Sequence, residues 1–235
     1  MDDISYSIVC CYYNEKPLLQ KKLYNFLNYI KKFPFKNEII ICDNFSTDGT
    51  IEILKKIEKN KYPNLKVIFN NKNLGKGGSV KKAIENSKNK YIVIFDLDEY
   101  LVEDLLIAHN IIKKNEEIDF LCGSRLLENN KFLYKKNLYG VILLTKLINF
   151  LYKTKLSDSA CATKIFKKEI YKKLKINNNG FDFEFEVLCK FAKLKYTVSE
   201  YKVRYFPRSF HEGKKLRAIT DGTKIFKTIL TSLIN

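Results

Sequence analysis

The ten residues Tyr91-Ile-Val-Ile-Phe-Asp-Leu-Asp-Glu-Tyr100 decide the fold of this chain. Five β-branched or aromatic residues predict a buried strand, and Asp96 and Asp98 follow it directly. In a parallel α/β sheet, the carboxyl ends of the strands open onto the ligand crevice. Two carboxylates at that edge can share a hard cation such as Mg²⁺ or Mn²⁺, which takes its remaining ligands from diphosphate oxygens and water. A simple polar turn after a strand is the alternative interpretation.

The residues before this strand alternate between strand and helix patterns. Strands are expected at 6–12, 38–42 and 65–69, each followed by a helix. Polar residues gather after each strand, and the segment 70–79 is a basic, glycine-rich turn that opens a helix. This order predicts an α/β fold with a central, mostly parallel sheet and helices on both faces.

The second half of the sequence is less regular. We expect a helix at 103–114, strands at 119–122 and 196–205, and an amphipathic helix at the C-terminus. Residues 180–188 open another helix, although Phe181, Phe183 and Phe185 also alternate as a strand or groove wall would. No repeat or linker divides the chain, so we expect one domain at 1–235 that ends in a basic and amphipathic segment at 206–235.

Composition limits the class of protein. Hydrophobic residues make up 46% of the chain and aromatic residues 14%, which excludes disorder for most of its length. The net charge of +17 indicates anionic partners, which include lipid surfaces, phosphates and nucleic acids. Charge alone does not choose among them.

Cysteine use and the apolar segments indicate a reduced protein without a membrane span. The six cysteines form no C-x-x-C pair, so we expect buried thiols and no zinc site. The first residues lack the pattern of a signal peptide. The apolar stretch 141–152 is well short of the roughly 20 residues that cross a bilayer. A cytoplasmic location is therefore expected.

Four segments in the first half resemble the motifs of one enzyme family. Ser7-Ile-Val-Cys-Cys-Tyr-Tyr-Asn-Glu15 resembles an S-I-V-I-P-x-Y-N-E opening. Asp43-Asn-Phe-Ser-Thr-Asp-Gly-Thr50 resembles D-D-G-S-T-D-G-T, and Asn73-Leu-Gly-Lys-Gly77 resembles N-x-G-K-G. Asp96-Leu-Asp98 is similar to D-A-D. Together these segments resemble family 2 inverting glycosyltransferases of the GT-A class.

Two segments in the second half continue the resemblance and narrow it to one branch. Gly123-Ser-Arg125 resembles the G-S-R after the next strand. The tail from Tyr205 to Arg217, with Asp221-Gly222, is similar to the Y-x-P-R-x-x-x-E-G-K-K-I-x-W-x-D-G segment of dolichol- or polyprenyl-phosphate mannose and glucose synthases. The resemblance covers nearly all of residues 6–222 and implies a Rossmann-like GT-A fold.

The resemblance also implies roles for individual residues. Those that would bind the nucleotide are Tyr13, Glu15, Asp43, Lys76 and Asp96. Those that would hold Mg²⁺ or Mn²⁺ are Asp96, Asp98 and Glu99. Those that would bind phosphates of donor or acceptor are Arg125, Arg208, Lys214, Lys215 and Arg217. Those that would support catalysis are Asp98, Arg125 and Glu184.

The sequence departs from the family pattern at four places. Cys11 replaces the usual proline, Asn44 replaces the second aspartate of D-D-G, and Phe45 replaces its glycine. Glu99 follows the D-x-D directly, where the family commonly has one more residue. The choice between a UDP-linked and a GDP-linked sugar therefore stays open.

The function implied is a hexosyltransferase that moves one sugar, with inversion, from a nucleotide sugar to a polyprenyl (dolichyl-type) phosphate. We expect it on the inner membrane face as a peripheral protein, bound directly or through a membrane-anchoring partner protein. A saccharide hydroxyl is the alternative acceptor, and it would need a general base such as Glu184 or Glu186. A basic nucleic-acid-binding module is a second alternative. Its signatures are missing from the sequence, so no nucleic-acid partner is expected.

Overall fold

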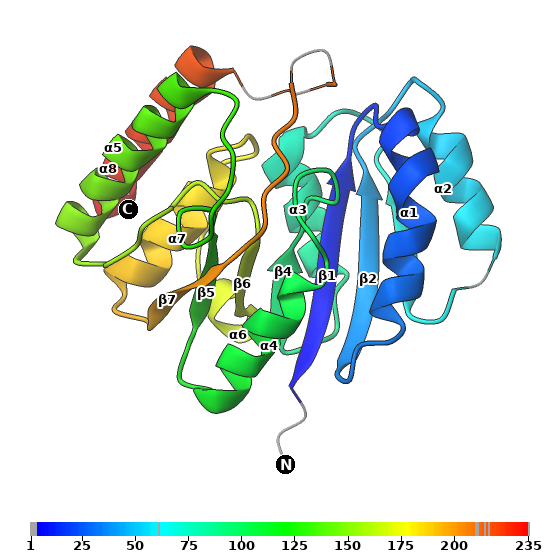
Figure 1. Cartoon of the computed structure of the whole chain (residues 1–235), viewed down its shortest axis with the longest axis horizontal. Helices are drawn as coiled ribbons and strands as arrows, with labels where there is room; N and C mark the ends of the chain where they lie inside the picture. The colour runs from blue at the N-terminus through cyan, green and yellow to red at the C-terminus, as the bar shows by residue number, and fades with distance from the viewer. Residues whose placement is uncertain (1–3, 61, 210–211, 214, 216, 235) are drawn as a thin grey trace.

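The computed structural model describes residues 4–60, 62–209, 212–213, 215 and 217–234, which form an α/β fold around a seven-stranded sheet (Figure 1). The order of strands across the sheet is β3-β2-β1-β4-β6-β5-β7. The strands are β1 (Ser5–Tyr12), β2 (Lys36–Asp43), β3 (Leu65–Phe69), β4 (Tyr91–Ile94), β5 (Phe120–Ser124), β6 (Lys164–Lys167) and β7 (Val198–Lys202). The helices are α1 (Lys16–Ile30), α2 (Thr50–Lys59), α3 (Gly75–Glu85), α4 (Asp104–Lys114), α5 (Lys135–Tyr152), α6 (Lys168–Tyr171), α7 (Phe183–Lys193) and α8 (Ala218–Ile234).

The first four strands form the parallel sheet that the sequence predicts. β1 pairs in parallel with β2 and β4, and β2 pairs in parallel with β3. All four residues of β4 are buried, as expected for a central strand of β-branched and aromatic residues. Its carboxyl end therefore delivers Asp96 and Asp98 to the same edge as the ends of β1 and β2.

One short strand runs against the others. β6 is antiparallel to both β4 and β5, and the sequence analysis did not find it because its Lys-Ile-Phe-Lys pattern is too short to show a period. Lys164 at its start pairs with Ile94 and Cys122, near the carboxyl ends of their strands. The reversed direction thus brings a buried lysine toward the same edge as Asp96.

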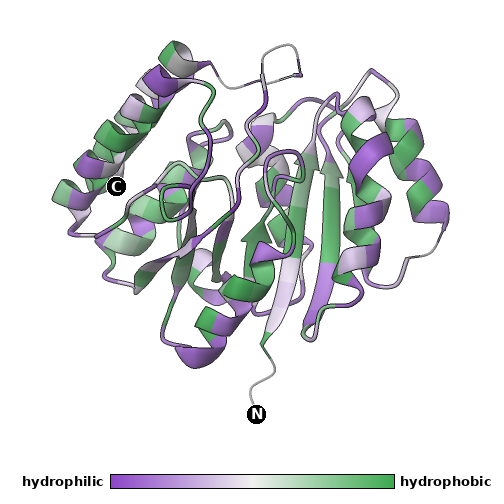
Figure 2. Cartoon of the chain, in the orientation of Figure 1, coloured by the Kyte–Doolittle hydropathy of each residue, from purple (hydrophilic) through white to green (hydrophobic). Residues whose placement is uncertain are grey.

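Helices cover both faces of the sheet, which confirms the predicted layers. Helices α1, α2 and α4 bury leucine and isoleucine side chains on one face, and α3, α5, α7 and α8 bury theirs on the other. Figure 2 shows hydrophobic and hydrophilic residues alternating along α5 at the margin of the molecule. The core is therefore a pair of apolar layers with the sheet between them.

Some boundaries differ from those predicted. β7 spans only Val198–Lys202 of the expected 196–205, and β5 ends two residues later than expected. The phenylalanine series lies at and before the start of α7, so its interpretation as a strand is wrong. Phe183 and Phe185 are nevertheless buried, as expected for core residues.

The glycine-rich turn lets the start of α3 lie directly on the chain before α7. Gly75 has φ +77°, and the N–H of Gly78 donates to the carbonyl of Asn179 at 3.1 Å. A Cβ on Gly77 would lie 2.4 Å from the Cβ of Phe183. Glycine is required here because two helix ends approach too closely for any side chain.

We predict that Gly77→Ala lowers the free energy of unfolding by about 1–3 kcal/mol, because the new methyl group overpacks the contact with Phe183. Gly140→Ala is the matched control, since a Cβ in that part of α5 meets nothing within 4 Å. It should raise stability by about 0.5–1 kcal/mol. Urea unfolding measures both, and equal effects of the two substitutions would contradict the packing argument.

Candidate active site

Charged side chains from distant parts of the chain meet at the carboxyl edge of β1, β2 and β4. Asp43 ends β2, Glu15 follows β1, and Asp96 and Asp98 follow β4. Lys76 comes from the start of α3, Glu184 from the start of α7, and Arg208 from the segment after β7. The structure thus brings together most of the residues that the sequence assigned to a site.

A line of alternating charges runs through the centre of this edge. The Nζ of Lys76 lies 2.7 Å from the Oδ2 of Asp96 and 2.8 Å from the Oε1 of Glu184. The other carboxylate oxygen of Glu184 lies 3.2 Å from the Nζ of Lys164. We call Asp96, Lys76, Glu184 and Lys164 the central ion ladder. The Lys164 side chain is fully buried and that of Glu184 is 8% exposed.

The charges of the ladder favour the ionised forms of Lys76, Lys164 and Glu184. Burial lowers the pKa of Lys76, but the charges of Asp96 and Glu184 raise it well above its ordinary value. Burial raises the pKa of Glu184, yet Lys76 and Lys164 together hold it below its usual range. Burial, with the negative charges of Asp98 and Glu184, outweighs Lys76 and raises the pKa of Asp96. Glu184 is therefore an ionised carboxylate held by two lysines and is poorly suited to accept a proton.

We predict that Glu184→Gln lowers the free energy of unfolding by about 3–5 kcal/mol, because it leaves the charge of Lys164 buried without its partner. Adding Lys164→Met to that variant should restore part of the loss. The control is Glu116→Gln, which removes a pair in which Glu116 is 46% exposed and should change stability by less than about 1 kcal/mol. Urea unfolding measures the free energy of unfolding of the three variants. A decrease for Glu184→Gln as small as that for the control would refute the claim that Glu184 compensates the buried charge of Lys164.

A second set of ion pairs ties the C-terminal segment to the site. Arg208 lies 2.5 Å from the Oδ2 of Asp98 and 3.0 Å from the Oε2 of Glu15. Lys215 also pairs with Glu15, and the Nζ of Lys22 donates to the backbone carbonyl of Asp98 at 3.0 Å. Burial lowers the pKa of Arg208, but the hydrogen bonds with Glu15 and Asp98 raise it above its ordinary value. Arg208 therefore joins the ends of β1 and β4 through their carboxylates.

Arg125 has a partner that the sequence analysis missed. Its Nε and Nη2 donate to the two carboxylate oxygens of Asp158 at 2.7 and 2.9 Å, and its guanidinium lies 5.2 Å from the centre of the Tyr205 ring. Burial raises the pKa of Asp158, but Arg125 holds it below its usual range. Asp158 lies 33 residues from Arg125 in an irregular segment, so no local pattern indicated it.

The predicted phosphate-binding residues do not form one cluster. Arg125 pairs with Asp158, whereas Arg208 pairs with Glu15 and Asp98. The backbone N–H of Arg217 donates to Asp221 at 2.7 Å, and Lys214 lies outside the described residues. The sequence assigned Glu15 and Asp98 to the site but did not indicate that they pair with Arg208, and it did not select Asp158, the partner of Arg125.

The predicted nucleotide residues include a buried carboxylate with an unused oxygen. Asp43 is fully buried, and its Oδ2 accepts from the N–H of Ser46 at 3.0 Å. Its Oδ1 has no hydrogen-bond partner among the described residues. Tyr13 lies nearby, with the Nζ of Lys215 5.9 Å from its ring centre. A buried acceptor without a donor is unfavourable unless a ligand supplies one.

The acidic groups after β4 fit a hard cation that shares its ligands with a substrate. Among the described residues, no three His, Cys, Asp or Glu side chains are grouped closely enough to hold a metal ion by themselves. Asp96 and Asp98 offer carboxylate oxygens, the ligand type of Mg²⁺ and Mn²⁺. Burial, followed by the negative charges of Asp98 and Asp96, raises the pKa of Glu99 to about 7. The donor set therefore suits a cation completed by diphosphate oxygens, with Glu99 close to it.

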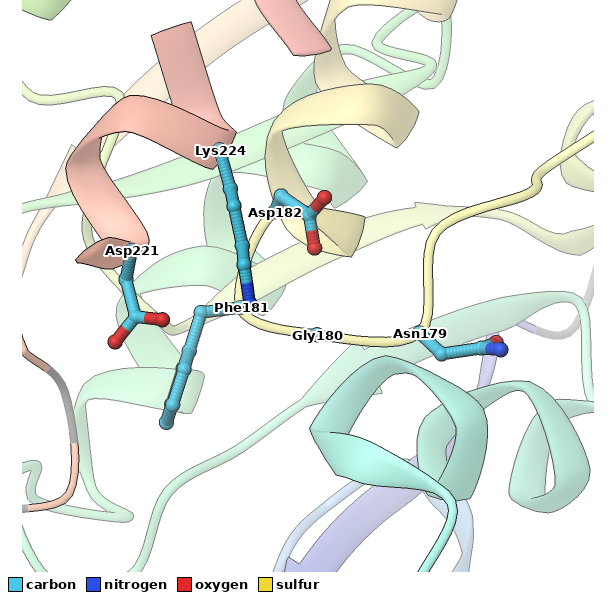
Figure 3. A pocket seen from close by; sticks show the side chains of 6 residues that line it. All are labelled: Asn179, Gly180, Phe181, Asp182, Asp221 and Lys224. Atoms are coloured by element: carbon cyan, nitrogen blue, oxygen red, sulfur yellow. The ribbon is translucent and has the colours of Figure 1, made fainter. Parts of the chain in front are cut away.

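A pocket of about 220 Å³ lies between the N-terminal ends of α7 and α8 (Figure 3). Its lining consists of Asn179, Gly180, Phe181, Asp182, Asp221 and Lys224. The Nζ of Lys76 lies 5.8 Å from the centre of the Phe181 ring, so the pocket adjoins the central ion ladder. Asp182 accepts a hydrogen bond from the hydroxyl of Thr228 at 3.2 Å. Sequence analysis did not select the polar residues of this pocket.

The fold and the acidic edge define a glycosyltransferase of the GT-A class, and comparison with known proteins identifies the family. Residues 7–175 match the profile of glycosyl transferase family 2, and the chain belongs to this family. The dolichyl-phosphate beta-glucosyltransferase of Dictyostelium discoideum is 27% identical over 248 residues, which cover 98% of this chain and 74% of that protein. The human enzyme of the same name is 26% identical over 242 residues, covering 95% and 73%.

Solved structures agree on the fold. One of them is glucosyl-3-phosphoglycerate synthase from Mycobacterium tuberculosis in complex with Mn²⁺, UDP and glucosyl-3-phosphoglycerate. It superposes on this chain with a TM-score of 0.69 at 14% sequence identity, and the match covers 98% of this chain and 80% of the synthase chain. TarS from S. aureus in complex with UDP-GlcNAc superposes with a TM-score of 0.63 at 17% identity, covering 99% and 67%. The expectation of a GT-A fold and of glycosyltransferase activity is confirmed.

Proposed function

We propose that this enzyme transfers a single hexose, with inversion, from a nucleotide-diphosphate sugar to a polyprenyl phosphate. The observation that carries the proposal is the state of Glu184, which is ionised and held between Lys76 and Lys164. A hydroxyl acceptor needs a general base, whereas a lipid phosphate is already ionised and can attack without one. The dolichyl-phosphate glucosyltransferases that match nearly the whole chain support the same acceptor class.

The donor would bind along the edge of β1, β2 and β4. Asp43 supports this because its buried Oδ1 can accept a hydrogen bond from a base or ribose. Asp96 and Asp98 would hold Mg²⁺ or Mn²⁺, which when bound offsets the charge that develops on the leaving diphosphate. Lys76 and Arg208 now pair with these two carboxylates and would donate to phosphate oxygens once the cation takes their place.

A saccharide hydroxyl remains the second candidate acceptor, and the pocket of Figure 3 favours it. The lining presents carboxylate, amide, ammonium and aromatic groups, which suit sugar hydroxyls and ring faces. Asp182 would then be the general base in place of Glu184, because its hydrogen-bond partner is a hydroxyl and not a lysine. The saccharide acceptor would therefore depend on Asp182, whereas the lipid phosphate would need no general base.

We predict that labelled hexose passes from a UDP- or GDP-linked donor to polyprenyl phosphate but not to polyprenol, which lacks the ionised oxygen. Asp182→Asn should leave this transfer within a few-fold of the parent enzyme. Thin-layer separation of charged lipid product measures both. The second candidate would replace the proposal if the enzyme formed no lipid product, transferred hexose to a saccharide hydroxyl, and lost that transfer in Asp182→Asn.

We predict that Asp98→Asn removes most activity while the fold is kept, because a neutral amide is a poorer ligand for a hard cation. The loss should exceed the roughly 10- to 100-fold that follows removal of an outer-shell partner of a metal. Glu116→Gln, at the opposite edge of the sheet, is the control. The activity of both variants is measured as the initial rate at increasing concentrations of Mg²⁺ or Mn²⁺. Full activity in excess chelator would disprove the metal assignment.

We also propose that the enzyme is a peripheral protein of anionic membrane surfaces, which it would need to reach a lipid substrate. Helices α5 and α8 pack together (Figure 1). Both helices carry exposed apolar side chains, which are Tyr139, Leu143, Phe150, Phe226, Leu230 and Ile234. Lysines lie on the same helices: Lys135, Lys136, Lys146, Lys224 and Lys227. Apolar burial next to basic groups favours anionic bilayers. No helix within the described residues is long and apolar enough to cross one.

We predict that the protein sediments with anionic vesicles at low salt, leaves them at high salt and binds neutral vesicles weakly. Leu143→Ser with Phe150→Ser, at positions 70% and 71% exposed, should reduce vesicle binding at least about tenfold, since full burial of one such side chain contributes roughly 1.5–3 kcal/mol. Tyr24→Ser on α1, at 42% exposure, is the control. Vesicle binding that changes neither with lipid charge nor with the two α5 substitutions would disprove the membrane proposal.

A further inference from the structure

Two of the six cysteines lie side by side at the end of the parallel sheet. Cys11 on β1 is the direct register partner of Cys42 on β2, and both side chains pack on the face covered by α3 and α7. Neighbouring strands lie about 4.8 Å apart, which is within the roughly 4.4–6.8 Å between Cα atoms that a disulfide spans. Cys10, the next residue along β1, packs on the opposite face.

The two thiols differ in access and in charge. Cys11 is partly buried, whereas Cys42 is fully buried. The hydrogen bond from Cys11 lowers the pKa of Cys42 against the effect of burial, and Ser79 and Lys82 lower it further. The same hydrogen bond, together with burial, raises the pKa of Cys11 well above its ordinary value. A small molecule reaches Cys11 first, and Cys42 is the better thiolate.

The pair lies directly beneath the groups assigned to the nucleotide. Asp43 and Asn44 follow Cys42, and the N–H of Asn44 donates to the carbonyl of Tyr12 at 2.8 Å. The Sγ of Cys42 lies 3.8 Å from the Oδ1 of Asn70. The Nδ2 of Asn70 donates to Ser79 at 3.0 Å and to Asn44 at 3.4 Å.

This network continues to the turn that carries Lys76. The Oδ1 of Asn44 accepts from the N–H of Leu74 at 2.7 Å, two residues before Lys76. The Nζ of Lys82 donates to the Oδ1 of Asn70 at 2.9 Å. A covalent bond between the sulfurs would withdraw Cys42 from Asn70, which bonds to Asn44 and is itself held by Ser79 and Lys82.

We propose that Cys11 and Cys42 form an oxidation site, at which a low-molecular-weight disulfide converts the pair into an internal disulfide that weakens nucleotide binding. The effect on binding rests on the nucleotide site of the proposed function. The formation of the disulfide does not. In a reducing compartment such a bond is transient and regulatory.

The chemistry balances without a further reactant. The Cys11 sulfur attacks the small disulfide RSSR while its proton passes to the Cys42 thiolate, and one RS⁻ leaves. That RS⁻ takes the proton back from Cys42 and becomes RSH. The Cys42 thiolate then attacks the Cys11 sulfur of the mixed disulfide and displaces the second RS⁻. Two cysteine sulfurs are oxidised by two electrons in total, and RSSR is reduced by the same two.

The test incubates the full chain with graded ratios of glutathione disulfide to glutathione, then maps disulfides by mass spectrometry of unreduced tryptic peptides. UDP and GDP binding are measured by calorimetry before oxidation, after it, and after dithiothreitol. The proposal expects a peptide that links Cys11 to Cys42, binding weakened several-fold, and recovery on reduction. Cys11→Ser should bind nucleotide as the parent does and resist oxidation, whereas Cys189→Ser, which removes a buried thiol of α7, should behave as the parent in both states.

Each outcome is decisive. Absence of the linked peptide at oxidising ratios, or linkage of other cysteines instead, overturns the proposal. A linked pair with unchanged nucleotide binding overturns it as well, as does equal loss of binding in oxidised Cys11→Ser. If the chain transfers no sugar, the mapped disulfide and the binding of UDP or GDP still report on this site, so the two proposals fail separately.

Discussion

Charge compensation at the carboxyl edge of the sheet is the constraint on which the rest of the site depends. Parallel strands bring Glu15, Asp96 and Asp98 to one edge, and like charges held close together in a partly buried place repel. Every one of these carboxylates has a cationic partner from another part of the chain. A buried ion pair contributes little net stability, but removal of one partner is costly. The ion pairs therefore fix where the connecting segments lie more than they stabilise the fold.

The same pairs would suit phosphate binding. Lys76 and Arg208 lie against the two aspartates of the D-x-D, so these two positive groups would become free to pair with phosphate oxygens if Asp96 and Asp98 held a divalent cation. A nucleotide diphosphate brings the negative charge that these groups then need. Glu184 pairs with Lys76 and is itself held by Lys164, which fixes the ammonium group of Lys76 at this edge. In this arrangement Glu184 would position Lys76, whereas the sequence predicts proton transfer by Glu184 only for a hydroxyl acceptor.

The sequence predicted the parallel strands, the layers of helices and the place of Asp96 and Asp98, because these features depend on local periodicity and on where polar residues follow apolar runs. It did not predict β6, Asp158 as the partner of Arg125, or Lys164 as the partner of Glu184. A four-residue strand shows no period, and partners 20 or 33 residues apart leave no local pattern. Arg125 and Arg208, both predicted to bind phosphates, are held by different carboxylates, and no local pattern indicated that difference either.

The departures from the family pattern have a physical meaning around Asp43. Phe45 replaces a glycine and has φ +66°, a left-handed conformation that is strained for an aromatic residue by roughly 1–3 kcal/mol. Its side chain is 47% exposed. This exposure does not stabilise the fold, because an apolar ring is stabilised by burial and not by contact with water. Two residues earlier lies the unpaired Oδ1 of Asp43. An exposed aromatic ring and an unused acceptor in one strained turn are suited to a flat base with an N–H group, which supports nucleotide binding at this turn.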